Sequence, residues 1–268
     1  MSGSWLEVHM IALLLVAGYA TRLYPLTINT PKPLLPVSGR AMLDYIVDEL
    51  DTLPDLSGIC LISNHRFAGQ FEEWAAVRRL VSPKVPITVL DDGTTDDSNK
   101  RGAIGDIQFA MDTMHIDEDI VIIAGDNLFT YRLLDMYDYF MKIRRDLLIA
   151  IRVKDKSQLQ KLAVATLDDA GKVLYMAEKP KEPESETAIY ATYFYLKETL
   201  PMISQYLMEG NTTDAPGNFP SWLYTRKEVY AYLADGNCID IGTPENYKDV
   251  TENFPLLWAE RKSLPGEL

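Results

Sequence analysis

The sequence has few cysteines and no long apolar run, and each shortage excludes a class of protein. Two cysteines, Cys60 and Cys238, are too few for a disulfide framework, and neither has a Cys or His at metal-ligand spacing. We expect both to be buried thiols in a reducing cytoplasm. The longest apolar stretch, Met10 to Ala17, is far too short to cross a bilayer, so no membrane segment is predicted.

The first residues lack the basic start and the cleavage site of a signal peptide, so residues 1–9 are interpreted as a tag or cloning remnant. No linker rich in Gly, Ser or Pro divides the rest, which predicts a single domain over residues 10–268 with a tail at 254–268. The content of 47% hydrophobic and 24% charged residues is typical of a soluble globular protein, which we expect in the cytoplasm.

Acidic residues are missing from one segment. No Asp or Glu occurs between residues 8 and 43, although the chain has 39 acidic residues and a net charge of -13. This segment carries Arg22, Lys32 and Arg40, and cations without neighbouring carboxylates favour a local pocket for phosphate groups. The acidic chain as a whole argues against nucleic-acid binding, because that requires a broad basic surface.

Apolar runs of strand length alternate with segments of helical period, which is typical of a largely parallel sheet between helices. Strands are predicted at 11–16, 58–63, 86–90, 119–124, 147–153, 188–196 and 228–233. Helices are predicted at 42–53, 68–80, 102–114, 132–143, 198–208 and after Thr243. Residues 162–167 and 173–178 predict an antiparallel hairpin. The expected class is α/β: a Rossmann-like three-layer α/β/α fold with a mixed, mostly parallel sheet and a hairpin insertion.

Polar residues that follow strands are the candidates for chemistry, because ligands bind beyond the carboxyl ends of parallel strands. Backbone N–H groups of residues 18–22 can form an anion-binding concavity. Lys32 lies between two prolines that restrict its backbone, which favours a phosphate-holding role. Asp126 and Asp240 each end an apolar strand segment, Asp126 after a glycine that lets the backbone pass close to a ligand. Two such oxygen ligands beside a triphosphate suit Mg²⁺.

The expected hairpin ends in Glu178 and Lys179. Glu178 can accept hydrogen bonds from sugar hydroxyls, and Lys179 can neutralise a phosphate. Taken singly, each candidate has an ordinary alternative as a turn or capping carboxylate, a polar strand end or a solvated surface cation. Their combination is more specific than any one of them.

The combination resembles the sugar-1-phosphate nucleotidyltransferases, also called nucleoside-diphosphate-sugar pyrophosphorylases, and is similar to the glucose-1-phosphate thymidylyl- and uridylyltransferases. The family has a Gly-x-Gly-Thr-Arg-Leu loop followed by Pro-Lys-Pro, Gly-Asp, Glu-Lys-Pro and Asp-x-Gly-Thr motifs. In this chain the five motifs occur in family order at residues 18–27, 31–37, 125–126, 178–180 and 240–243.

The resemblance implies an enzyme that joins a nucleoside triphosphate to a sugar 1-phosphate and releases pyrophosphate, by in-line transfer that depends on Mg²⁺. It implies dTTP or UTP, a glucose-like 1-phosphate and a homo-oligomer. The implied catalytic residues are Arg22, Lys32 and Asp126, and the implied metal ligands are Asp126 and Asp240. The nucleotide would contact Ala17, Gly18, Tyr19, Ala20, Thr21 and Gly102, and the sugar phosphate would contact Ala163, Glu178 and Lys179.

Departures from the family pattern leave the sugar open. Ala20, Ala163 and Ala191 replace usual glycines, and a positive φ at Ala20 would cost on the order of 1 kcal/mol. The main alternative is a non-catalytic paralogue that binds a nucleotide or sugar nucleotide in a regulatory role. A dinucleotide-binding oxidoreductase is disfavoured because the loop is not Gly-x-Gly-x-x-Gly, and a phosphatase or nuclease because it would not need the cationic loop. Trp258 could mark a subunit interface or dock on its own subunit.

Overall fold

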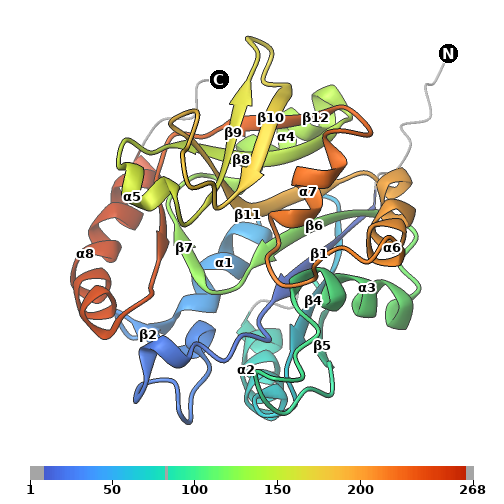
Figure 1. Cartoon of the computed structure of the whole chain (residues 1–268). Helices are drawn as coiled ribbons and strands as arrows, with labels where there is room; N and C mark the ends of the chain where they lie inside the picture. The colour runs from blue at the N-terminus through green and yellow to red at the C-terminus, as the bar shows by residue number, and fades with distance from the viewer. Residues whose placement is uncertain (1–8, 82–83, 264–268) are drawn as a thin grey trace, which may run out of the picture.

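A sheet with parallel strands at its centre organises the chain, and the computed structural model describes residues 9–81 and 84–263 (Figure 1). β1 (Met10–Leu15) is the central strand. It pairs in parallel with β4 (Leu56–Ser63) on one side and with β6 (Asp119–Ala124) on the other. These strands are rich in aliphatic residues because both faces of the sheet are covered.

The other strands extend this centre in both directions. β5 (Ile87–Asp91) pairs in parallel with β4, and β11 (Thr187–Tyr195) pairs antiparallel with β6. The antiparallel hairpin of β9 (Ala163–Leu167) and β10 (Val173–Glu178) joins the sheet through β11. The remaining strands are β8 (Asp146–Arg152), which pairs with β11, and β12 (Val229–Leu233), which pairs with β8. The predicted mixed, mostly parallel sheet with a hairpin insertion is confirmed.

Helices cover both faces of the sheet. This is shown by successive residues of β1, which belong to different hydrophobic clusters. Ala12 and Leu14 pack with apolar residues of α1, α2 and α4, whereas Ile11 and Leu13 pack with those of α3, α6 and α7. The three-layer α/β/α class is therefore confirmed. The helices are α1 (Met42–Leu50), α2 (Ala68–Val81), α3 (Ala103–Met114), α4 (Leu133–Ile143), α5 (Lys156–Leu159), α6 (Leu200–Met208) and α7 (Asn218–Leu223).

Several short elements were not predicted, because two to six residues carry no clear periodicity. They are α5, α7, β2 (Pro36–Val37), β3 (Arg40–Ala41) and β7 (Asn127–Phe129), whereas β13 (Cys238–Asp240) matches the apolar strand segment that was expected to end at Asp240. The pairing of β7 with β13 matters most, because it sets Asp240 opposite Asn127 and therefore beside the end of β6. Two helix boundaries also differ: α1 ends at Leu50, and α6 begins at Leu200 after a 3₁₀ turn.

The last helix, α8 (Pro244–Ser263), corrects the expected tail. The Thr243 hydroxyl accepts a hydrogen bond from the backbone N–H of Asn246 at 3.2 Å, which confirms Thr243 as the helix cap. The helix continues without a break through residues 254–263. Residues 264–268 of the expected tail and residues 1–8 of the expected tag lie outside the described residues.

Trp258 docks on its own subunit. Its side chain is 6% exposed, and its ring packs against those of Tyr45 and Phe254 with centroids 5.0 and 5.7 Å away. This packing attaches α8 to α1. Trp258 is therefore part of the core and not an exposed interface residue.

The structure tests the expectation that both cysteines are buried. Cys60 is fully buried, and burial raises the pKa of its thiol to about 12. Cys238 is only partly buried, so the expectation of a buried thiol is confirmed for Cys60 and wrong for Cys238. Among the helices in the described ranges, none has the length and apolar character needed to cross a membrane.

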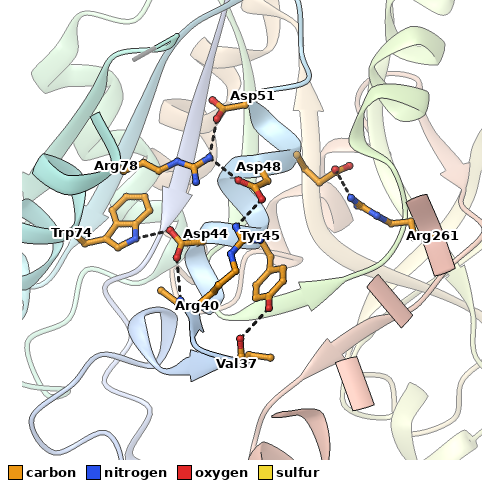
Figure 2. Close-up of polar contacts among 11 residues, drawn as sticks. Val37, Arg40, Asp44, Tyr45, Asp48, Asp51, Trp74, Arg78 and Arg261 are labelled. Atoms are coloured by element: carbon orange, nitrogen blue, oxygen red, sulfur yellow. Dashed lines mark hydrogen bonds and ion pairs between the residues drawn. The ribbon is translucent and has the colours of Figure 1, made fainter. Parts of the chain in front are cut away.

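Ion pairs connect α1 to α2 and to the strand before it (Figure 2). Asp48 accepts hydrogen bonds from Arg40 and from Arg78, each at 2.7 Å, and Asp51 accepts a further one from Arg78 at 2.8 Å. The side chain of Arg78 is 9% exposed, so its charge depends on these carboxylates. Arg40 is thus used to position α1.

We expect Asp48→Asn to lower the free energy of unfolding at pH 7 by about 1–2 kcal/mol, because two arginines each lose a charged partner. Burial raises the pKa of Asp48, but hydrogen bonds from Arg40 and Arg78 outweigh it and hold the pKa below its ordinary value of 3.8. The stabilisation is therefore present above pH 3.8 and is lost as the pH falls through the folded-state pKa.

Urea unfolding of the wild type, Asp48→Asn and the control Asp169→Asn measures this difference. Asp169 is exposed in the hairpin turn, and its replacement should change little. Equal stability of the wild type and Asp48→Asn at pH 7 would contradict the expectation, and so would a difference that widens as the solution is acidified.

Candidate active site

A pocket lies beyond the carboxyl ends of β1, β5 and β6, where the sequence analysis expected ligands, and encloses about 340 Å³. The loop after β1 forms one wall, and the polar loop with the start of α3 forms another. The end of β6, β13 and the loop before α7 complete it. The predicted site residues that line it are Ala17, Gly18, Tyr19, Ala20, Arg22, Lys32, Gly102, Asp126 and Asp240.

Lys32 lies between Asp126 and Asp240. Its Nζ is 3.1 Å from Oδ2 of Asp126 and 2.8 Å from Oδ1 of Asp240, although these residues are 94 and 208 positions away along the chain. Lys32 is 4% exposed, whereas the two carboxylate side chains are 48% and 55% exposed. Burial lowers the pKa of Lys32, but the two carboxylates outweigh burial, so the pKa is raised and the ammonium stays charged. We call these three residues the Lys32 cluster.

The prediction of a cationic pocket without nearby carboxylates is wrong. The acid gap exists along the sequence, but the fold brings carboxylates from later segments to Lys32. Arg40 pairs with Asp48 and does not line the pocket. The charge of one sequence segment does not show which side chains the fold brings close to it from other segments. In the folded chain the site contains charges of both signs.

The donor set of the Lys32 cluster fits a magnesium ion. Mg²⁺ binds through one or two protein carboxylates and completes its coordination with water and substrate phosphates. Asp126 and Asp240 supply two such carboxylates on one pocket wall. Within the described ranges no group of three or more His, Cys, Asp or Glu side chains could hold a metal. The two carboxylates alone leave most of an octahedral coordination shell to water and substrate phosphates.

Hydrogen bonds to neighbouring segments hold the loop after β1. The Asn64 side chain donates to the carbonyl of Ala17 at 2.8 Å, and the Tyr19 hydroxyl donates to the carbonyl of Thr94 at 3.1 Å. Ala20 has φ 46° and ψ 44°, so the positive φ considered for the missing glycine is present, at a cost of about 1–2 kcal/mol. Thr21 is exposed and, unlike its neighbours, does not line the pocket.

Two glycines allow close approaches within the protein. Gly102 has φ 78°, and a Cβ there would lie 2.6 Å from the carbonyl oxygen of Thr213, so only glycine fits. Gly125 was expected to let the backbone pass close to a ligand. Instead, a Cβ at Gly125 would overlap the side chain of Val16, so this glycine allows the ends of β1 and β6 to come together.

The predicted sugar-phosphate residues lie beside this pocket and not in its wall. Glu178 ends β10, and a Cβ at Gly217 would overlap its carboxylate and lie 3.2 Å from the Cβ of Ala163. Burial raises the pKa of Glu178, although Lys179, whose Nζ is 3.7 Å away, opposes this. Pro216 lines the pocket, so the Glu178 region adjoins it through residues 216–217.

Sequence reasoning missed the residues that close the pocket on the side of β5. Asp92 and Asp106 line it and are 2% and 5% exposed. Lys100 forms ion pairs with Asp97 at 3.4 Å and Asp214 at 2.9 Å, and all three line the pocket. Asp92 follows a strand, as Asp126 does, so the same rule could have found it. Asp106 lies within a helix, and no local signal marks it.

Comparison with known proteins shows which family the chain belongs to. The family model described as Nucleotidyl transferase matches residues 11–255. The chain is 26% identical over 240 residues to the bifunctional protein GlmU of Methanocaldococcus jannaschii, covering 88% of this chain and 52% of that protein. It is 25% identical over 248 residues to the UTP–glucose-1-phosphate uridylyltransferase AglF of Haloferax volcanii, covering 91% and 96% of the two chains.

A solved structure shows the same fold. The crystal structure of UDP-glucose pyrophosphorylase complexed with UDP-glucose matches with a TM-score of 0.77 and 18% identity, covering 93% of this chain and 99% of that chain. The chain spans about half to two thirds of the length of several curated relatives. Because the family model covers nearly the whole chain, the protein belongs to the nucleotidyl transferase family.

Proposed function

We propose that the protein is a sugar-1-phosphate nucleotidyltransferase, which joins a nucleoside triphosphate to a sugar 1-phosphate and releases pyrophosphate. The observation that carries this proposal is the Lys32 cluster, with its buried cation and two carboxylates at the ends of strands. Nucleotidyl transfer requires positive charge on the phosphates and precise positioning, with little covalent chemistry by the protein. A pure binding protein has little need of both carboxylates, which disfavours the regulatory paralogue.

Each charged group has a role in this proposal. Asp126 and Asp240 would hold Mg²⁺, which neutralises charge on the phosphates when it is bound. Lys32 is oriented by the carboxylates before substrate arrives, so little reorganisation is needed to stabilise the triphosphate. Arg22 is exposed on the pocket wall, where it can bind the departing pyrophosphate. Residues 17–20 would contact the nucleotide through their backbone.

The second substrate would bind beside Glu178, between the β9–β10 hairpin and the start of α7. The Glu178 carboxylate would accept hydrogen bonds from sugar hydroxyls, and Lys179 would contact the sugar phosphate. An oxygen of that phosphate attacks the α-phosphorus, and the bond from the α-phosphorus to the bridging oxygen breaks as pyrophosphate leaves. A dTTP or UTP substrate, a glucose-like sugar and a homo-oligomer stay expectations of the sequence resemblance, and a cytoplasmic location stays an expectation of the composition.

Pyrophosphate release tests the proposed activity. The protein with Mg²⁺, each of five nucleoside triphosphates and a panel of sugar 1-phosphates should release pyrophosphate, measured with a coupled pyrophosphatase assay. Chelation with EDTA should stop the release. The proposal is wrong if no combination gives pyrophosphate above the rate without enzyme.

Removal of charge from the Lys32 cluster should reduce turnover. We expect Lys32→Ala and Asp126→Ala each to lower kcat by about 100-fold or more, because each removes a group that stabilises charge in the transition state. The matched control is Lys154→Ala, at an exposed position outside the pocket. Circular dichroism checks that each variant is folded. Folded variants with near-normal Mg²⁺-dependent rates would refute these assignments.

Gly217→Ala tests the sugar site. The added Cβ must displace the Glu178 carboxylate, so we expect KM for the sugar 1-phosphate to rise about tenfold, which corresponds to the loss of one hydrogen bond to a charged group. KM for the nucleotide should change much less. Gly69→Ala is the control, because its Cβ would meet open space on α2. An unchanged sugar KM in a folded Gly217→Ala variant would argue against Glu178 as a sugar ligand.

A further inference from the structure

Residues 213–217, which lead into α7, lie between the pocket and the Glu178 region, and we call them the bridging segment. Asp214 and Pro216 line the pocket, whereas Gly217 contacts Glu178. The helix that follows, α7, packs on β10, the strand that ends in Glu178 (Figure 1). One short piece of backbone therefore adjoins both proposed substrate sites.

The first turn of α3 holds one end of the bridging segment. The N–H groups of Ala103 and Ile104 have no acceptors within their own helix, because they lie at its start. They donate instead to the carbonyls of Asp214 at 3.3 Å and Thr213 at 3.0 Å. Gly102 permits this contact, because a Cβ there would lie 2.6 Å from the Thr213 carbonyl oxygen. The segment therefore completes the helix terminus and is docked there by its backbone.

An ion pair reinforces this contact. Nζ of Lys100 lies 2.9 Å from Oδ1 of Asp214 and 3.4 Å from Oδ1 of Asp97. The hydrogen bond to Asp214 outweighs burial and raises the pKa of Lys100, so the ammonium stays charged. The side chains of Lys100 and Asp214 are 44% and 62% exposed, so the ion pair is of modest strength. It joins the polar loop after β5 to the bridging segment.

The other end of the bridging segment supports the Glu178 carboxylate. Gly217 is buried, and a Cβ there would overlap this carboxylate and lie 3.2 Å from the Cβ of Ala163. Glu178 and Ala163 are paired across the β9–β10 hairpin, so the three residues form one close contact. A shift of Gly217 toward the hairpin would displace the carboxylate, and a shift away would leave it without support.

We propose, on the basis of the proposed function, that Asp214 is a positioning residue for the sugar 1-phosphate. Its backbone bond to α3 and its ion pair with Lys100 fix the bridging segment. The segment in turn holds the Glu178 carboxylate where it can accept hydrogen bonds from sugar hydroxyls. Asp214 thus acts through Gly217 and Glu178 and needs no contact with the sugar itself.

The sheet order makes this proposal specific. Lys100 belongs to the loop after β5, and β5 and β10 lie at opposite ends of the sheet path that runs through β1. An effect of Lys100 on the sugar substrate would therefore have to pass through the bridging segment. A residue that only contacted the nucleotide would change the KM for the nucleotide and leave the KM for the sugar 1-phosphate unchanged.

Steady-state kinetics with both substrates varied test the inference. We expect Lys100→Ala and Asp214→Ala each to raise the KM for the sugar 1-phosphate about twofold to fivefold, the range of an exposed ion pair, with less change in kcat. The double variant should be no worse than either single variant, because the two residues act as one unit. Asp214→Glu keeps the charge and should recover most of the loss. Lys172→Ala, which breaks an exposed 2.7 Å ion pair with Glu228, is the matched control.

The outcomes separate this inference from the proposed function. A wild-type sugar KM in folded Lys100→Ala would overturn it, and so would effects that multiply in the double variant. If one single variant does not fold, the other decides. If no substrate combination gives pyrophosphate, the proposed function fails, and amide hydrogen exchange of the ligand-free protein still tests the joint. Exchange of the Ala103 and Ile104 N–H groups should be about twofold to fivefold faster in Lys100→Ala and unchanged in Lys172→Ala. Equal exchange in Lys100→Ala and the wild type would overturn the inference.

Discussion

The contact of Lys32 with Asp126 and Asp240 is the interaction on which the candidate site depends. It joins three segments from distant parts of the chain: the loop after β1, the end of β6 and the end of β13. The ion pairs do not create this arrangement alone, because the pairing of β13 with β7 already places Asp240 beside the end of β6. A buried ammonium group is stable only with such partners, so the backbone pairing and the charges support one another.

Carboxylates occupy two different environments in this pocket. At the Lys32 cluster they are half exposed, and their charge suits a metal ion that also binds phosphates. At Asp92 and Asp106 the carboxyl groups are buried, with 2% and 5% of each residue exposed. The two pairs therefore differ in their access to solvent. An acidic protein can therefore bind a highly charged anion, provided that a metal and a few fixed cations offset the carboxylates near the phosphates.

The long elements could be predicted from the sequence because their apolar patterns reflect burial on one or both faces. Asp126 could be found because it follows a strand and Asp240 because it ends a short apolar strand segment, and the strained backbone of Ala20 could be anticipated from a missing glycine. The pairing of β7 with β13 could not, since three residues carry no pattern and their partners are distant in sequence. For the same reason, the closeness of Gly217 to Glu178 depends on tertiary structure and leaves no local signal.

The most direct test of the central claim is Mn²⁺ binding to the Lys32 cluster, measured by electron paramagnetic resonance with Mn²⁺ in place of Mg²⁺. Two carboxylates already paired with Lys32 should bind the ion weakly by themselves. They should bind it at least tenfold more tightly when a non-hydrolysable nucleoside triphosphate adds phosphate ligands. Asp240→Asn should abolish this gain. Mn²⁺ binding that is the same with and without the nucleotide, or that is unchanged in Asp240→Asn, would contradict the account.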